Sequence, residues 1–330
     1  MKKILIIGSN SFAGSDFIDF LLNKNFRVYG VSRRKEIAKQ HLKYKNNKNL
    51  KNFQFYKINL NINKDIYRLI KIIKKNKINH IVNFAAQGMV AESWIKPEDW
   101  YYTNIFSNSI LIKELSKLKI KKYLNFSTPE VYGNTSSLLK ENNNFSPTTP
   151  YAISRSAQDW NLLAYSKIYN FPAVITRAAN IYGPYQQSYR IIPKIIISIL
   201  KNKLIPIHGK GDTVRSFVYM SDVSKALFKI LIDKKNIGET FHISSKKFIS
   251  ILNLSKLINK LMNVKNKNIY HVAERDGKDL KYTLNSDKIR NYYSWSEEIN
   301  LEKGIINTID WVKRNINYFK KSSLKYIHKK

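Results

Sequence analysis

The sequence contains no cysteine among its 330 residues, which excludes disulfide bonds and metal sites built on thiolates. Glycine and proline number only 11 and 8, so long low-complexity linkers are not expected. No stretch approaches the ~20 consecutive apolar residues of a membrane span. The apolar run at 4–7 is too short for a secretory signal, and a glycine follows it at once. We therefore expect a cytoplasmic protein with no membrane span.

Acidic residues are also few: the chain has 23 Asp and Glu residues and 58 Lys and Arg residues, which gives a formal net charge of +35. Such an excess is typical of proteins that bind nucleic acids or anionic membranes. The lysines are scattered through the whole chain together with many Asn and Ile residues, a pattern that favours a compositional bias over a binding patch. We expect no specific nucleic-acid partner, although a general positive field favours an anionic small substrate.

In the first half of the chain, continuous apolar runs alternate with segments of helical periodicity. The predicted strands are 3–8, 26–32, 53–60, 78–86, 121–127 and 171–183. The predicted helices are 12–25, 65–77, 104–119 and 150–169. This alternation predicts an α/β fold with a doubly wound parallel sheet of the Rossmann type, whose ligands bind at the carboxyl ends of the strands.

The second half is less regular. Helices are predicted at 190–203, 251–262 and 299–316, and residues 205–223 are interpreted as a hairpin or a loop that enters a helix. We expect an NAD(P)-binding Rossmann domain at 1–178 and a smaller α/β C-terminal substrate-binding lobe at 179–330. No linker separates them, and the lobe is expected to interleave with the first domain near 205–245.

The segment GSNSFAG at 8–14 follows a strand and opens a helix, which is the setting of a dinucleotide-binding loop. Gly8 permits the tight turn and Gly14 permits close packing of helix on strand, while Ser11 stands where the middle glycine is usual. Free amides of Ser11 and Phe12 at the helix start would face a diphosphate. An ordinary turn between strand and helix is the alternative.

The end of the second strand reads GVSRR at 30–34 and lacks the acid that selects NAD by binding the adenosine ribose. Arg33 and Arg34 suit a 2′-phosphate instead. The sequence therefore favours NADP, with NAD as the alternative. The other interpretation of the two arginines is a solvated basic turn.

Three further motifs carry a family resemblance: STPE at 127–130, YAISR at 151–155 and RAANIYGPY at 177–185. With them the chain resembles the extended short-chain dehydrogenases/reductases, most closely the nucleotide-sugar 4,6-dehydratases of the dTDP-glucose and GDP-mannose types. NFAAQ at 83–87 and the long stretch at 205–223 extend the resemblance over nearly the whole chain. It implies transient C4 oxidation by NAD(P)+, loss of water from C6, and an NDP-4-keto-6-deoxyhexose for surface-polysaccharide or glycan synthesis.

The resemblance also implies the catalytic roles. Tyr151 would take the proton of the C4 hydroxyl, which requires a nearby cation because a free tyrosine has a pKa near ~10. The partner one helical turn later is Arg155, where the family has Lys. Thr128 would hydrogen-bond the same hydroxyl, and Glu130 would remove the C5 proton. Pro129 replaces the acid that protonates the leaving hydroxyl in the glucose-type enzymes, so Glu130 or a water must do so here.

The remaining site residues follow from the resemblance alone. The additional cofactor contacts are Asn59, Leu60, Ala85, Ala86 and Asn104. The expected contacts to the nucleotide-diphosphate hexose are Ser93, Asn180, Arg190, Arg215 and Arg275. A homodimer through the helices at 104–119 and 150–169 is implied as well.

Two other functions remain open at this point. A C4-epimerase, reductase or decarboxylase of the same fold would act on the same class of substrate, and Glu130 is the residue that argues against a simple epimerase. A cofactor-bound scaffold that binds RNA or a membrane through its basic surface is the alternative that is not an enzyme.

Overall fold

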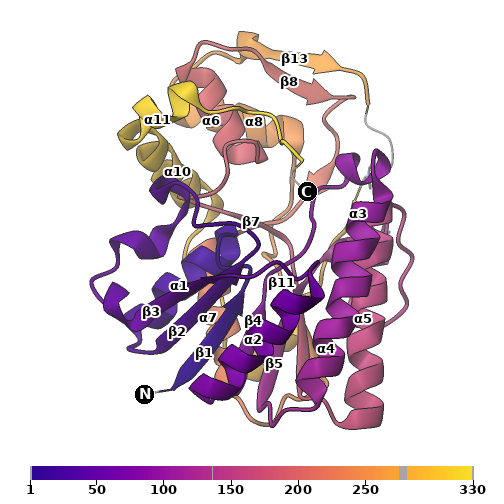
Figure 1. The fold of residues 1–330 in the computed structure, drawn as a ribbon. Coiled ribbons are helices and arrows are strands. Elements are labelled where there is room, and N and C mark those ends of the chain that lie inside the picture. Colours follow the sequence, from indigo (N-terminus) through magenta and orange to yellow (C-terminus); the bar gives the residue numbers. More distant parts are fainter. Residues whose placement is uncertain (1, 136, 275–280, 329–330) are drawn as a thin grey trace.

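The computed structural model describes residues 2–135, 137–274 and 281–328. Its centre is a sheet of seven parallel strands in the order β11-β6-β5-β4-β1-β2-β3, with helices on both faces (Figure 1). The predicted doubly wound parallel sheet is thereby confirmed. The strands are β1 (Lys3–Ile7), β2 (Arg27–Ser32), β3 (Phe53–Lys57), β4 (His80–Asn83), β5 (Lys122–Ser127), β6 (Ala173–Ala178) and β11 (Thr240–Ile243).

The helices bury opposite faces of this sheet. Helices α1 (Phe12–Asn23) and α7 (Met220–Ile232) contribute to one apolar cluster, whereas α2 (Asn63–Asn76), α4 (Asn108–Ser116) and α5 (Pro150–Tyr169) contribute to the other. Because both faces are covered, the central strands are buried at almost every position.

The predicted helix at 104–119 is irregular at its start. Helix α3 (Pro97–Tyr101) leads into a π-helical segment, η5 (Tyr102–Ser107), which continues as α4. Wide π turns inside helices are frequent at functional sites. Here the π-helical segment carries the buried Asn104.

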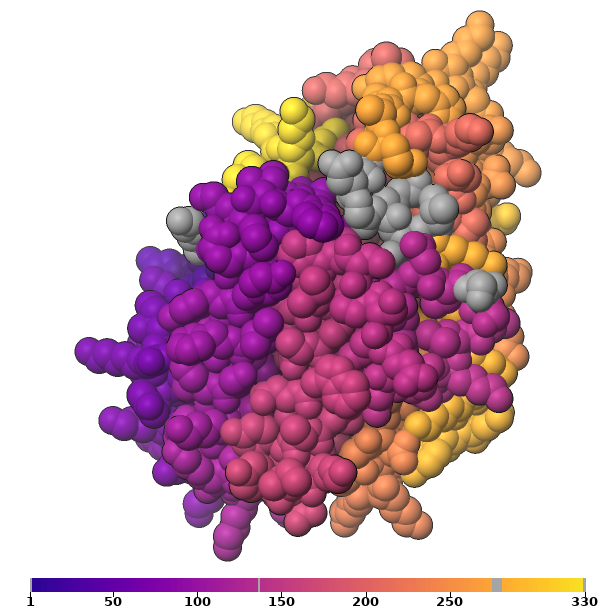
Figure 2. Space-filling view, turned by 90° about the vertical axis from the view of Figure 1, so that its right-hand side faces the viewer, coloured from indigo at the N-terminus to yellow at the C-terminus, as the bar shows by residue number. Residues whose placement is uncertain are grey.

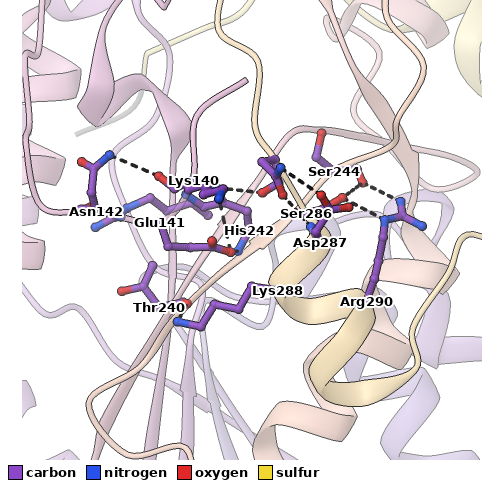
Figure 3. Close-up of polar contacts among 12 residues, drawn as sticks. Lys140, Glu141, Asn142, Thr240, His242, Ser244, Ser286, Asp287, Lys288 and Arg290 are labelled. Carbon is purple, nitrogen blue, oxygen red and sulfur yellow. Dashed lines mark hydrogen bonds and ion pairs between the residues drawn. The ribbon is translucent and has the colours of Figure 1, made fainter. Parts of the chain in front are cut away.

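The seventh strand, β11, was not predicted, because it is only four residues long and lies in the irregular half of the chain. It pairs in parallel with β6 and forms one edge of the sheet. Figure 3 shows how this edge is covered: the backbone amide of His242 donates to Glu141 Oε1 at 2.8 Å, and Lys288 Nζ donates to the Thr240 carbonyl at 2.8 Å. Lys288 lies on α9 (Asp287–Tyr293). A covered edge does not offer a template for pairing with another chain.

Among the described residues, the upper lobe in Figure 1 is built on four helices and three two-stranded sheets. The helices are α6 (Ile191–Leu200), α8 (Ile251–Leu261), α10 (Leu301–Arg314) and α11 (Ile316–Lys321). The strand pairs are β7 (Asn180–Tyr182) with β10 (Phe217–Tyr219), β8 (Ile205–His208) with β13 (Ile269–Val272), and β9 (Val214–Arg215) with β12 (Ile249–Ser250). Short helical turns connect the larger elements: η1 (Lys39–His41), η2 (Lys43–Asn46), η3 (Leu50–Asn52), η4 (Ala91–Trp94), η6 (Pro129–Tyr132) and η7 (Asn266–Asn268).

The segment 205–223 is not a hairpin, because its three short strands each pair with a strand from elsewhere in the chain. It does lead directly into a helix, α7. From there the chain returns to the central sheet: α7 packs on α1, and β11 joins β6. The domain boundary at 178 stays a prediction. Within the described residues no helix has the length and hydropathy to cross a membrane.

Candidate active site

A cavity of about 820 Å³ lies between the carboxyl ends of the sheet strands and the upper lobe. Its size is that of a small-molecule site. Sixteen residues singled out from the sequence line it, drawn from both halves of the chain. They are Gly8, Ser11, Phe12, Arg33, Arg34, Asn59, Leu60, Ala85, Ala86, Thr128, Glu130, Tyr151, Arg155, Asn180, Arg190 and Arg215.

Three predicted residues lie behind the cavity wall, and Arg275 lies outside the described residues. Ser93 is fully buried, and its hydroxyl donates to the Val90 carbonyl at 2.6 Å and accepts from the amide of Tyr151 at 3.2 Å. Asn104 accepts from the amide of Gln87 at 2.8 Å and donates to Ser154 Oγ at 2.9 Å. Both residues therefore contact wall residues rather than the cavity itself. Gly14 is the third.

The loop between β1 and α1 is shaped for close approach. Gly8 has a φ of +86°, and a Cβ atom there would meet the backbone nitrogen of Ala85 at 2.7 Å. A Cβ atom on Gly14 would overlap the Gly8 carbonyl oxygen. The Ser11 hydroxyl caps α1 by accepting from the Gly14 amide at 3.0 Å, so the first amides of the helix remain oriented along its axis. Such a helix start fits the diphosphate of a dinucleotide.

The end of β2 presents positive charge to the cavity. Ser32 Oγ accepts from the Asn10 amide at 3.0 Å, and the Asn10 side chain donates to the carbonyl of Lys35 at 2.9 Å, which fixes the turn. Burial lowers the pKa of Arg33, and the charge of Arg34 lowers this pKa further. An arginine stays protonated even so, which makes this corner of the cavity suitable for a phosphate.

The predicted catalytic side chains meet beyond the end of β5. Thr128 begins the short helix η6, and its hydroxyl donates to Glu130 Oε2 at 3.2 Å. Tyr151 lies in the first turn of α5, where Pro150 and the Thr149 cap set the helix start. Burial raises the pKa of Tyr151; the charge of Arg155 and a hydrogen bond with Thr128 lower this pKa, and the charge of Glu130 raises it.

Arg155 is buried, and its Nη2 atom donates to the Phe126 carbonyl at 2.5 Å. Its buried Nε atom finds no acceptor among the described residues. An unsatisfied buried donor costs about 1–3 kcal/mol, so an acceptor from a bound ligand would be favoured at this point of the cavity wall. Together with the glycine loop, this donor fits a nicotinamide dinucleotide.

The loop that carries Thr128 and Glu130 is held at both ends by a buried ion pair. Ser127 Oγ donates to Asp159 Oδ2 at 2.8 Å, and Arg177 Nη2 lies 3.0 Å from the same oxygen. Arg177 Nη1 also donates to the Tyr132 hydroxyl at 2.5 Å. The side chains of Arg177 and Asp159 are both 0% exposed. Asp159 lies on α5, two turns beyond Tyr151, so the same helix carries the tyrosine and the loop anchor.

On the lobe side, Asn180 and Arg215 meet at a tyrosine. The Tyr282 hydroxyl donates to Asn180 Oδ1 at 2.9 Å, and the Arg215 guanidinium lies 4.1 Å from the centre of the Tyr282 ring. Arg190 lies at the exposed mouth, over the ring of Tyr189.

Sequence reasoning did not single out several cavity residues. They are Gln87, Glu92, Tyr189, Lys194, His208, Tyr282 and Tyr326. Gln87 falls inside the stretch NFAAQ, which resembles the family, and could have been chosen there. Tyr326 offers no signal, because its basic terminal segment has no motif or periodicity.

The family model described as GDP-mannose 4,6 dehydratase matches residues 5–308. The dTDP-D-glucose 4,6-dehydratase of Bos taurus is 30% identical over 330 residues, covering 97% of this chain and 91% of that protein. The crystal structure of dTDP-glucose 4,6-dehydratase from Bacillus anthracis in complex with NAD has a TM-score of 0.86 at 26% identity, over 97% of this chain and 99% of that one.

An epimerase is similar too: the UDP-glucuronic acid 4-epimerase of Bacillus cereus, solved with UDP-glucuronic acid and NAD, has a TM-score of 0.84 at 25% identity, over 95% of this chain and 99% of that one. The matching family model and the identity with dehydratases along nearly the whole chain decide between the two groups. The chain belongs to the GDP-mannose 4,6 dehydratase family, within the extended short-chain dehydrogenases/reductases, and is a nucleotide-sugar 4,6-dehydratase.

Proposed function

We propose that the protein dehydrates a nucleoside-diphosphate hexose at the site formed by Thr128, Glu130, Tyr151 and Arg155. The observation that carries this proposal is the position of a carboxylate and a tyrosine on one cavity wall, both in contact with Thr128. The nicotinamide cofactor, when bound, accepts a hydride from C4 and returns it to C6. Arg33 and Arg34 favour NADP in this chain, and NAD, which the Bacillus anthracis enzyme holds, is the alternative.

Tyr151 takes the proton of the C4 hydroxyl in the first step. Its phenol must lose its own proton to do so, and burial alone opposes this by raising the pKa. Arg155 supplies the largest compensation, because its positive charge favours the phenolate. Thr128 donates to Glu130 in the structure and is close enough to Tyr151 to orient the same sugar hydroxyl.

Glu130 acts in the second step. A ketone at C4 makes the C5 proton acidic, and the Glu130 carboxylate accepts it. No acid stands between Thr128 and Glu130, since Pro129 is buried there and has no proton to give. Glu130, now protonated, returns its proton to the departing C6 hydroxyl, directly or through a water. The proton removed from C5 thus leaves in the product water, and the carboxylate is restored. When the hydride has returned to C6, C5 needs a new proton, which Glu130 takes from solvent and delivers. The proton that Tyr151 took from the C4 hydroxyl is released to solvent.

The diphosphate of the substrate would lie toward the upper lobe. Arg215 and Arg190 provide guanidinium groups suited to phosphate oxygens, and Asn180 is held in place by Tyr282. The bovine relative's name makes dTDP-glucose the first substrate to test, with GDP-mannose second because of the family model. The 4-keto-6-deoxy product would serve surface-polysaccharide or glycan synthesis.

The test is incubation of the purified enzyme with a panel of NDP-hexoses, with the products weighed by mass spectrometry. We expect one sugar to lose a single water. Glu130→Gln should still oxidise C4, so reduced cofactor accumulates while no water is lost. Glu98→Gln, on the exposed surface of α3, is the matched control and should turn over normally. A wild-type enzyme that returns every sugar at unchanged mass contradicts the proposal and favours an epimerase.

We also propose a cytoplasmic homodimer. Tyr102, Phe106, Ile153 and Trp160 are 42–51% exposed on neighbouring helical segments, and Figure 2 shows the face formed by α4 and α5 as one broad surface. Exposed apolar side chains gathered in this way are typical of protein interfaces. Light scattering on a sizing column should give the mass of a dimer for the wild type and of a monomer for Trp160→Glu. A wild-type monomer at micromolar concentration would refute the dimer.

A further inference from the structure

The end of the chain forms a strap between the two halves of the molecule. Residues 322–328, here called the C-terminal strap, follow α11 and run from the upper lobe toward α3 (Figure 1). They lie beyond residue 308, where the match to the family model ends. The strap is therefore a feature of this chain that the family match does not cover.

The strap is attached to the upper lobe at its beginning. Ser188 Oγ donates to the Ser323 carbonyl at 2.7 Å, and Lys201 Nζ donates to the Ser322 carbonyl at 3.3 Å. Further along, the Tyr326 ring packs edge-on against Tyr189, with 5.2 Å between the ring centres. These contacts bring Tyr326 to the cavity, which it lines.

The strap ends on the sheet half of the molecule. Gln87 Nε2 donates to the Tyr326 hydroxyl at 2.9 Å. The His328 ring stacks on Trp100 with 5.0 Å between centres, and its Nε2 atom lies 2.7 Å from Asp99 Oδ2. Trp100 is fully buried, so His328 is held by a fixed surface of α3. The strap thus crosses the cleft from one half to the other.

Two neighbours indicate which part of the cavity the strap closes. Tyr326 is close enough to Arg33 to raise the pKa of its guanidinium, and Arg33 stands at the end of β2, where Rossmann proteins bind the adenosine ribose. Gln87 follows Ala85 and Ala86 in the loop after β4, and the backbone of Ala85 lies against Gly8 of the dinucleotide loop. The strap therefore covers the adenosine half of the dinucleotide position.

We propose that the C-terminal strap is a wall of the cofactor site that retains the dinucleotide, with Tyr326 as a cofactor-binding residue and His328 as the contact that keeps the strap closed. The inference rests on the proposed function for the presence of a nicotinamide cofactor. A dehydratase that returns its hydride to the product regenerates the cofactor in every turnover, so the cofactor does not need to leave. A closed wall on the adenosine side is compatible with such a cycle.

The test measures cofactor release from the full-length protein. Wild type, Tyr326→Phe, His328→Gln and the double variant Tyr326→Ala/His328→Ala are loaded with NADPH or NADH, and release is followed by fluorescence during a chase with oxidised cofactor. Each hydrogen bond lost should speed release about 2- to 12-fold, so the double variant, which loses two, should release cofactor about 4- to 140-fold faster. Ile327→Ala is the matched control, because this side chain lies between the two and is 62% exposed.

Two comparisons decide the outcome. If the double variant releases cofactor within about twofold of wild type, or if Ile327→Ala speeds release equally, the strap does not retain the cofactor. The melting temperature of the cofactor-free protein should be nearly the same in all variants. If the double variant has a lower melting temperature than wild type, the comparison uses Tyr326→Phe instead, because this variant keeps the ring. The sugar assay on wild type tests the proposed function separately; a wild type that binds neither dinucleotide would overturn both.

Discussion

The buried pair of Arg177 and Asp159 allows the sharpest quantitative prediction. Its two side chains are 0% exposed and 3.0 Å apart, and the pair anchors Ser127 and Tyr132 on either side of the catalytic loop. Asp159→Asn keeps the shape of the side chain and removes its charge. The Arg177 charge then stays buried without its counter-ion, which costs about 3–5 kcal/mol of the free energy of unfolding.

The expected change in melting temperature follows from the length of the chain. For 330 residues, an unfolding entropy of about 2.1 cal/mol/K per residue amounts to ~0.7 kcal/mol/K, so the loss lowers the melting temperature by about 4–7 °C. Calorimetry and urea unfolding of the cofactor-free protein measure it, since a bound ligand would add its own stability. Asp310→Asn, on the exposed side of α10, is the control and should change the free energy by less than about 0.5 kcal/mol.

A double-mutant cycle tests the reasoning itself. Arg177→Met combined with Asp159→Asn should be less destabilised than the sum of the two single variants, because the second change removes the unpaired charge left by the first. The loop should also lose its position, so kcat of either single variant falls while the protein remains folded. A drop in melting temperature below about 1 °C for Asp159→Asn, or strict additivity of the two changes, refutes the account.

Three further predictions concern single side chains. Arg155→Met removes the charge that lowers the pKa of Tyr151, so the rise of kcat/KM with pH should move to higher pH, while Arg155→Lys moves it less; identical profiles contradict this role. His242 has its pKa lowered to about 3 by burial and the charge of Arg177, below the ~6.5 of the unfolded chain, so stability falls as pH drops below ~6.5. Between pH 7 and 5, urea unfolding of the wild type should show that the free energy of unfolding falls by about 2 kcal/mol, and His242→Gln should lack this fall. If the free energy changes with pH equally in both proteins, the buried histidine is not its cause. Arg33→Ala should weaken NADP binding about tenfold or more and leave NAD binding within about threefold, measured by titration; equal losses contradict a 2′-phosphate site.

The elements that could be predicted from the sequence are those in which nearly every residue is buried. Strand β1 is covered on both faces, so its apolar run stands out in the sequence. By contrast, β11 has four residues, one of them a buried histidine, and its place beside β6 depends on contacts with segments more than 60 residues away. Periodicity within a short window contains no such information.

The residues of the candidate site likewise divide into those that the sequence predicts and those that it does not. Gly8, Thr128 and Tyr151 lie in local motifs whose neighbours in sequence are also neighbours in space, so their convergence on one cavity was predictable. The lining by Tyr326 was not, because it depends on how a basic tail crosses the molecule. Ser93 shows a third case: the resemblance made it a substrate contact, but its hydroxyl is already engaged by the Val90 carbonyl and the Tyr151 amide.

The position of β11 at the sheet edge has a consequence for synthesis of the protein on the ribosome. When β6 has emerged, its outer edge still lacks its partner, and the chain must continue through the first strands of the upper lobe and α7 before residues 240–243 are available. During that interval the nascent sheet exposes an open row of backbone groups, the condition under which strands of two nascent chains pair wrongly. Chaperone contact during synthesis would accordingly matter most between the emergence of Ala178 and that of Ile243.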